Sequence, residues 1–127
     1  MKNKKLILVA RIALGLILVI FGANKFFGFM PMPPMPKAAG SLMSAFGAAG
    51  YLFPMLAIVE IGVGVMLLTN RFVALSLLFL APLSVNIILF HLALDPAGIG
   101  AGALVFLLNL FMLFAYKEKY NAVLKSQ

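Results

Sequence analysis

Four long apolar runs, separated by shorter segments with more polar residues, form the main pattern of the chain. The runs cover residues 6–23, 51–69, 72–90 and 97–116. Drawn as helices they are apolar on every face, as expected of helices that lie in lipid. A transmembrane helix needs roughly 20 mostly apolar residues, and in lipid each segment must satisfy its own backbone polar groups. The sequence therefore predicts an all-α membrane protein, a four-helix antiparallel transmembrane bundle that forms a single domain.

The connections between the runs are unequal. Short turns at residues 70–71 and 91–96 predict that the last three helices form neighbouring antiparallel hairpins. The first connection, residues 24–50, is long, and the four prolines of its Met/Pro segment, residues 30–36, exclude a helix there. A short helix lying at the membrane surface is predicted over residues 37–46. Its apolar face would consist of Leu42, Met43 and Phe46.

The first run needs a separate decision, because lysines precede it as they precede a signal peptide. Arg11 interrupts its apolar residues, and Phe21-Gly22-Ala23 is a poor cleavage site. We therefore expect a retained helix.

Composition narrows the class further. Hydrophobic residues make up 65% of the 127 residues and charged residues only 10%, whereas ordinary soluble domains are about a quarter charged. These values exclude a soluble globular domain, a disordered chain and a fibrous repeat. Cysteine is absent, which excludes disulfides, thiolate metal sites and a dithiol relay within the chain. We predict no metal site and no cofactor in the chain itself.

The net charge of +7 lies mainly at the ends of the apolar runs, so it indicates topology and not a nucleic-acid partner. With the N-terminus inside, two basic residues, Lys25 and Lys37, lie outside. The seven on the inner side are Lys2, Lys4, Lys5, Arg71, Lys117, Lys119 and Lys125. This asymmetry predicts that both ends of the chain are cytoplasmic.

Glu60 is the main candidate for chemistry, because it lies near the middle of the second run, where a charge costs about 2.5–3.5 kcal/mol. It would serve either as a proton-accepting or ligand-binding carboxylate, or as a structural partner of another helix. Counted from the inner side at 1.5 Å per residue, Arg11 lies about 7.5 Å deep and Glu60 about 13.5 Å deep. Arg11 is therefore the expected partner of Glu60, unless it snorkels to the headgroups.

A second polar set gathers at the outer end of the predicted helices. It contains Asn24, Lys25, Asn86, His91 and Asp95. His91 could pass protons to a bound ligand or merely cap a helix end. Asn86 could line a site or satisfy the carbonyl that Pro82 leaves free, Lys25 could anchor its helix at the headgroups, and Lys25 with Asp95 could form a weak pair at the rim.

These positions predict a ligand pocket open toward the outer leaflet. Glu60 and Asn86 should both border one cavity, with Pro82 kinking its helix and the Met/Pro segment and surface helix covering the opening. Such a cavity suits a molecule with a polar head and a hydrophobic body. A separate stripe of small residues, Gly98 and Gly102, predicts close packing within the bundle or between two copies of the chain.

Several short stretches, taken in order, resemble the DoxX family of small four-helix membrane proteins over about residues 9–120. They are Arg11-x3-Gly15, Phe21-Gly22-Ala23-Asn24-Lys25-Phe26, Pro54 with Glu60-Ile61-Gly62, Leu80-Ala81-Pro82 with Asn86 and Phe90-His91, and Pro96-Ala97-Gly98. The family includes membrane subunits associated with thiosulfate:quinone oxidoreductases. The resemblance implies an inner-membrane (plasma-membrane) protein with a quinone or quinol site and a redox partner.

The sequence thus leads to one functional hypothesis and one alternative, and leaves open whether the chain is an enzyme. In the first, it is a redox-associated membrane subunit that binds a quinone-like or other lipophilic ligand. The ligand-binding residues would be Glu60, Arg11, Asn24, Lys25, Asn86 and His91. In the alternative, the chain is a non-enzymatic small transporter, lipid-binding protein or membrane assembly factor.

Overall fold

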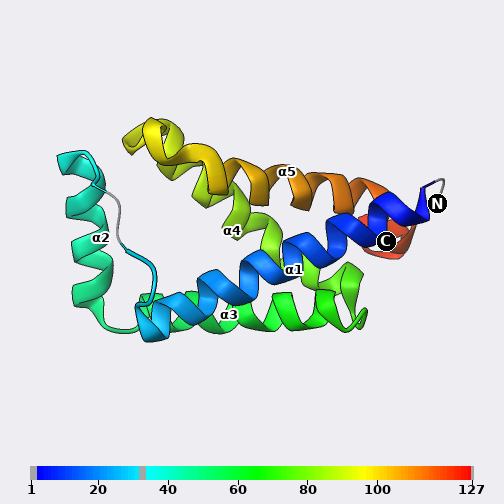
Figure 1. Ribbon diagram of the computed structural model, residues 1–127. Helices are drawn as coiled ribbons and strands as arrows, with labels where there is room; N and C mark the ends of the chain where they lie inside the picture. Colours follow the sequence, from blue (N-terminus) through cyan, green and yellow to red (C-terminus); the bar gives the residue numbers. More distant parts are fainter. Residues whose placement is uncertain (1–2, 32–33, 127) are drawn as a thin grey trace.

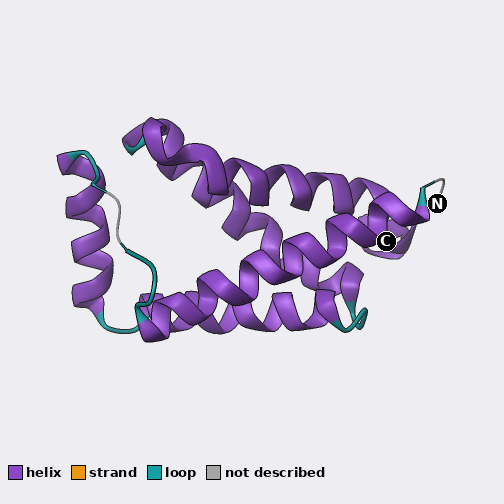
Figure 2. Ribbon diagram, in the orientation of Figure 1, coloured by secondary structure: helices purple, strands orange, loops and turns teal. Residues whose placement is uncertain are grey.

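The computed structural model describes residues 3–31 and 34–126, and in them every regular element is a helix (Figures 1 and 2). Lys2 of the basic N-terminal segment and Met32 and Pro33 of the Met/Pro segment lie outside the described residues. The main helices are α1 (Lys4–Phe27), α2 (Lys37–Ala49), α3 (Leu52–Leu68), α4 (Val73–Leu94) and α5 (Ile99–Ala115). Short helical turns follow as η1 (Pro96–Gly98), η2 (Lys117–Tyr120) and α6 (Asn121–Leu124).

Three helical segments are long and apolar enough to cross a membrane by themselves: α1, α4, and η1 together with α5. The fourth candidate is the pair α2 and α3, which meets at an angle of 91°. The all-α membrane class predicted from the sequence is confirmed, with three or up to four candidate spans.

α1 and α3 pack closely in opposite directions because glycines face each other across the contact (Figure 1). A Cβ atom on Gly64 would lie 2.9 Å from the carbonyl oxygen of Gly15, and one on Gly22 would lie 3.1 Å from that of Ala57. Small residues allow two helix backbones to approach each other in this way. This contact fixes the register between α1 and α3, and that register brings Lys25, near the end of α1, to Glu60 on α3.

α4 and α5 also run in opposite directions, and polar side chains join them. The Ser84 hydroxyl donates to Asn109 Oδ1 at 2.9 Å, and Asn109 Nδ2 donates to the Leu77 carbonyl at 3.3 Å. Both side chains are fully covered. In an apolar interior such bonds hold two helices at one rotation and register.

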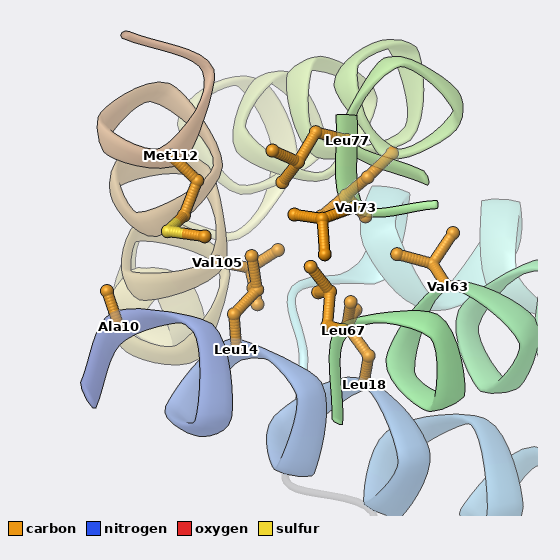
Figure 3. Close-up of a cluster of buried hydrophobic side chains, with 10 residues drawn as sticks. Ala10, Leu14, Leu18, Val63, Leu67, Val73, Leu77, Val105 and Met112 are labelled. Atoms are coloured by element: carbon orange, nitrogen blue, oxygen red, sulfur yellow. The ribbon is translucent and has the colours of Figure 1, made fainter. Parts of the chain in front are cut away.

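The buried core lies between α1, α3, α4 and α5, where Leu14, Leu67, Val73 and Val105 point toward one another (Figure 3). Large apolar side chains also cover the outside: Phe27 is 79% exposed and Phe114 is 69% exposed. Such a continuous apolar exterior is typical of a surface that contacts lipid, because exposing it to water would be unfavourable.

Two helices extend beyond the ends predicted from the apolar runs. α1 continues to Phe27, where Gly28 adopts a left-handed conformation (φ 61°) and its N–H bonds the Asn24 carbonyl. α4 continues to Leu94 and ends before Pro96, which disfavours helical geometry in the residue preceding it. The polar residues at these two ends are compatible with a helix, so α1 continues past them to Gly28 and α4 to the residues just before Pro96.

The first connection agrees with the prediction in its described part. The described residues of the Met/Pro segment are not helical, and α2 follows at Lys37 and ends at Ala49, three residues later than expected. α2 lies across the end of the molecule opposite the two termini (Figure 1). α4 is one continuous helix through Pro82, so the kink there stays a prediction.

Candidate functional site

A cavity of about 530 Å³ lies at the end of the molecule covered by α2. Both Glu60 and Asn86 border it, as the sequence predicted. Side chains of all five main helices contribute to its walls, and most of them are apolar. Its polar lining consists of Lys25, Glu60, Asn86, His91 and Asp95. The predicted cover is present as well, since Met35, Leu42, Met43 and Phe46 line the same cavity.

An ion pair forms one polar wall of this cavity. Lys25 Nζ lies 2.9 Å from Glu60 Oε1 and 3.0 Å from Glu60 Oε2, so the ammonium group bonds both carboxylate oxygens. The Glu60 side chain is only 5% exposed, whereas that of Lys25 is 24% exposed. The pair therefore presents its cationic end to the cavity and keeps the carboxylate deeper.

The expected ion pair between Arg11 and Glu60 is wrong. Arg11 lies near the opposite end of the molecule, where Nη1 donates a hydrogen bond to the carbonyl oxygen of Leu67. Leu67 belongs to the last turn of α3, whose carbonyls lack partners within the helix. Arg11 thus caps the C-terminus of α3, where the helix dipole also favours a positive charge. It does not line the cavity.

Lys25 takes the place assigned to Arg11 because α1 is longer than predicted. Near its end, a Cβ atom on Gly22 would lie 3.2 Å from Glu60 Cβ, so Gly22 faces Glu60 directly. Lys25, three residues further on, lies on the same face of α1 and reaches back along it. The expectation that Lys25 anchors the helix at the headgroups, or pairs with Asp95, is replaced by this contact.

His91 and Asp95 form the second polar wall, in the last turn of α4 and just after it. His91 Nδ1 lies 3.3 Å from the Asp95 carbonyl oxygen and 4.0 Å from Asp95 Oδ2. The imidazole ring stands edge-on to Phe90, at 5.2 Å between ring centroids. These contacts fix the orientation of the imidazole ring at the edge of the cavity.

The two asparagines of the predicted site differ in position. Asn86 lines the cavity and has no hydrogen-bond partner among the described residues, so it does not satisfy the carbonyl freed by Pro82. Asn24 lies outside the cavity lining. Its Oδ1 accepts a hydrogen bond from the Met30 N–H at 2.7 Å, which holds the chain after α1 in place.

The stripe formed by Gly98 in η1 and Gly102 in α5 packs within the chain. A Cβ atom on Gly102 would lie 2.8 Å from His91 Cδ2, and one on Gly98 would lie 2.7 Å from Asp95 Oδ2. Gly98 and Gly102 therefore make room for the second polar wall. A contact between two copies through these glycines stays a prediction.

Asp95 is the polar cavity residue that the sequence analysis missed: it was placed in the outer polar set but was not predicted to bind a ligand. Its side chain is 7% exposed and lines the cavity. The spacing of four residues from His91 was the available signal, because residues four apart lie on the same face of a helix. The predicted end of the helix at Phe90 hid that relation.

Apolar helices of membrane length around a cavity lined by a few polar side chains define a small integral membrane protein with a cavity at one end. A sequence model of the DoxX family matches residues 6–93, well over half of the chain. The chain belongs to the DoxX family, which confirms the resemblance seen in its motifs. No curated protein and no solved structure matches the chain.

Proposed function

We propose that this DoxX protein binds a quinone-like amphiphile in the cavity beneath α2 and serves as a redox-associated subunit of the inner membrane. The observation that carries the proposal is the cavity itself. At about 530 Å³ it falls within the range of small-molecule sites, and it combines apolar walls with a few convergent polar groups. Lys25 and Asn86 would donate to a carbonyl oxygen of the head, and the apolar lining would hold the ring and the start of the tail.

The proposal includes the membrane arrangement expected from the sequence: α1, α3, α4 and α5 cross as a four-helix antiparallel bundle with both termini in the cytoplasm. The basic residues support this orientation, because among those that the structure describes only Lys25 and Lys37 lie toward the end with the cavity. Lys25 is paired with Glu60, so Lys37 is the single unpaired lysine or arginine at this end among the described residues. The cavity then lies in the outer leaflet.

Topology is tested with reporters that are active on one side of the membrane only. A cytoplasmic reporter fused to the C-terminal end should be active, and the same reporter inserted at Pro34 should be inactive. The reverse pattern would place the cavity in the inner leaflet and would overturn the orientation.

Ligand binding is tested on the detergent-purified chain with decylubiquinone as the probe and with two matched variants. Ala101 lines the cavity, whereas Ala103, two residues along α5, does not. Ala101→Phe should fill the cavity and weaken decylubiquinone binding at least about tenfold, corresponding to about 1.4 kcal/mol. Ala103→Phe should leave binding unchanged. Equal effects of the two variants, or no saturable binding, would reject the quinone-like ligand.

Mass spectrometry of the lipophilic molecules that copurify with the chain supplies the second measurement. A quinone that is retained by the unaltered chain and by Ala103→Phe, and lost from Ala101→Phe, would support the proposal. A phospholipid showing that same dependence would instead favour the lipid-binding alternative.

A further inference from the structure

Asp95 is the exception among the buried polar side chains of the described residues. The other five are Arg11, Glu60, Ser76, Ser84 and Asn109, and each makes a side-chain hydrogen bond. Asp95 as a whole residue is 5% exposed, yet no described residue donates a hydrogen bond to its carboxylate. A buried carboxylate without donors is unfavourable, so such an exception requires an explanation.

A helix-capping role does not explain it. Asp95 immediately precedes the short helix η1, a position where an aspartate side chain often accepts a backbone N–H. Here the side chain makes no such bond, and the turn is closed by the Asp95 backbone carbonyl, which accepts from Gly98 N–H at 3.1 Å. The nearest cationic candidate, His91 Nδ1, is 4.0 Å from the carboxylate.

The carboxylate faces the cavity. Among the described residues, no fully covered side-chain oxygen or nitrogen lacks a hydrogen-bond partner, so the unbonded Asp95 oxygens must border open space. Asp95 lines the cavity, as does Gly98, whose missing side chain leaves room beside Asp95 Oδ2. The open space next to this acceptor is therefore the cavity proposed above to hold the ligand.

The charges around the cavity favour a particular kind of head. Its ionisable lining residues are Lys25, Glu60, His91 and Asp95. Lys25 and Glu60 neutralise each other, which leaves the Asp95 carboxylate beside the His91 imidazole, whose Nδ1 lies 4.0 Å from Asp95 Oδ2. A negatively charged head would be repelled, and a head with only acceptor atoms would leave Asp95 unsatisfied.

We infer that the cavity selects an amphiphile whose head carries no negative charge and donates a hydrogen bond to Asp95, as a hydroxyl or an ammonium group does. This inference rests on the proposed function, because it names the chemistry of the ligand in the same cavity. For a quinone-like ligand it favours the reduced form over the oxidised form, since a quinol adds hydroxyl donors for Asp95 and a quinone has none.

The test uses three amphiphiles with the same tail: dodecanol, dodecylamine and dodecanoate. Each is added to the detergent-purified chain at equal concentration, and the bound fraction is measured by native mass spectrometry. Dodecanol, dodecylamine or both should be bound about tenfold more than dodecanoate. Binding of dodecanol alone assigns a hydroxyl head, and binding of dodecylamine alone assigns an ammonium head.

Two variants with the same change of charge locate the effect. Asp95→Asn should reduce binding of the preferred amphiphile about tenfold, whereas Glu118→Gln, which neutralises an exposed acid in η2 at the other end, should leave it unchanged. The ranking of the three amphiphiles on the unaltered chain does not depend on whether Asp95→Asn folds.

The outcomes separate this inference from the proposed function. If Ala101→Phe abolishes binding but dodecanoate binds as well as the others, or Asp95→Asn has no effect, the inference is wrong and the cavity remains a ligand site. If no amphiphile responds to Ala101→Phe, the cavity is not a ligand site and both fail.

Discussion

Replacing Gly64 by alanine should force α1 and α3 apart. The added Cβ atom would lie 2.7 Å from Val19 Cγ2, 2.9 Å from the Gly15 carbonyl oxygen and 3.1 Å from the Val19 backbone nitrogen. A side chain can rotate away from such an overlap, but two of these three atoms belong to the backbone of α1. The contact is therefore relieved only if one helix moves.

Gly62, on the same helix, supplies the matched control, because nothing lies within 4 Å of a Cβ atom placed there. Overpacking a well-filled interior costs about 1–3 kcal/mol, and the backbone contacts at Gly64 argue for the upper end. The preference of alanine over glycine in a helix, about 1 kcal/mol, offsets part of that cost. Since this preference is common to both variants, Gly64→Ala should be less stable than Gly62→Ala by about 3 kcal/mol.

The free energy of unfolding is measured by titrating SDS into mixed detergent micelles and following helix content by circular dichroism. Thermal unfolding of the same samples, followed by size-exclusion chromatography, provides an independent ranking. Equal stability of Gly64→Ala and Gly62→Ala would mean that α1 and α3 do not meet at this glycine, and the register that joins Lys25 to Glu60 would fall with it.

Two further changes test the ion pair and the inner end of the molecule. Lys25→Met should lower the free energy of unfolding by about 3 kcal/mol, because it leaves Glu60 unpaired. A double-mutant cycle of Lys25→Met with Glu60→Gln should show a coupling energy. The effects of Arg11→Met and Glu60→Gln should instead add within a few tenths of a kcal/mol, because Arg11 bonds Leu67. Tyr120→Phe should cost about 1 kcal/mol by removing a hydrogen bond to the α4 backbone. Burial, and to a smaller extent the neighbouring Tyr116, raises the pKa of Tyr120. The stability that the neutral Tyr120 contributes is therefore complete below about pH 10 and is lost as pH rises through the raised pKa. Unfolding curves taken at increasing pH should show this loss of stability in the unaltered chain and not in Tyr120→Phe.

The elements and the cavity could be predicted from the sequence because they depend on local pattern. Apolar runs of membrane length determine where helices form, and the polar residues at one end of those runs indicate where polar groups gather. The position of Glu60 and Asn86 on one cavity was predicted from the polar residues that gather at the outer ends of the helices, with Glu60 deeper in the bundle. The cover over it follows from the apolar residues of a segment whose prolines exclude a continuous helix.

The partners of the charged residues could not be predicted in the same way. Depth along the helices favoured Arg11 as the partner of Glu60, but pairing also depends on helix rotation and on where each helix ends. α1 ends four residues beyond the predicted limit, which brings Lys25 within the last turn and onto the face that meets Glu60. The role of Asp95 was hidden for the same reason, since it requires α4 to continue past His91.

The length of α3 has a consequence for how a ligand reaches the cavity. Its 17 residues span about 25 Å at 1.5 Å per residue, whereas the hydrocarbon core of an average bilayer is about 30 Å thick. Lipid around a span this short is drawn inward to match it. Because α2 turns by 91° across the end of α3, the thinned outer leaflet would lie level with the cavity beneath it. In the proposed orientation, a hydrophobic ligand would enter the cavity sideways from the acyl chains, without leaving the membrane.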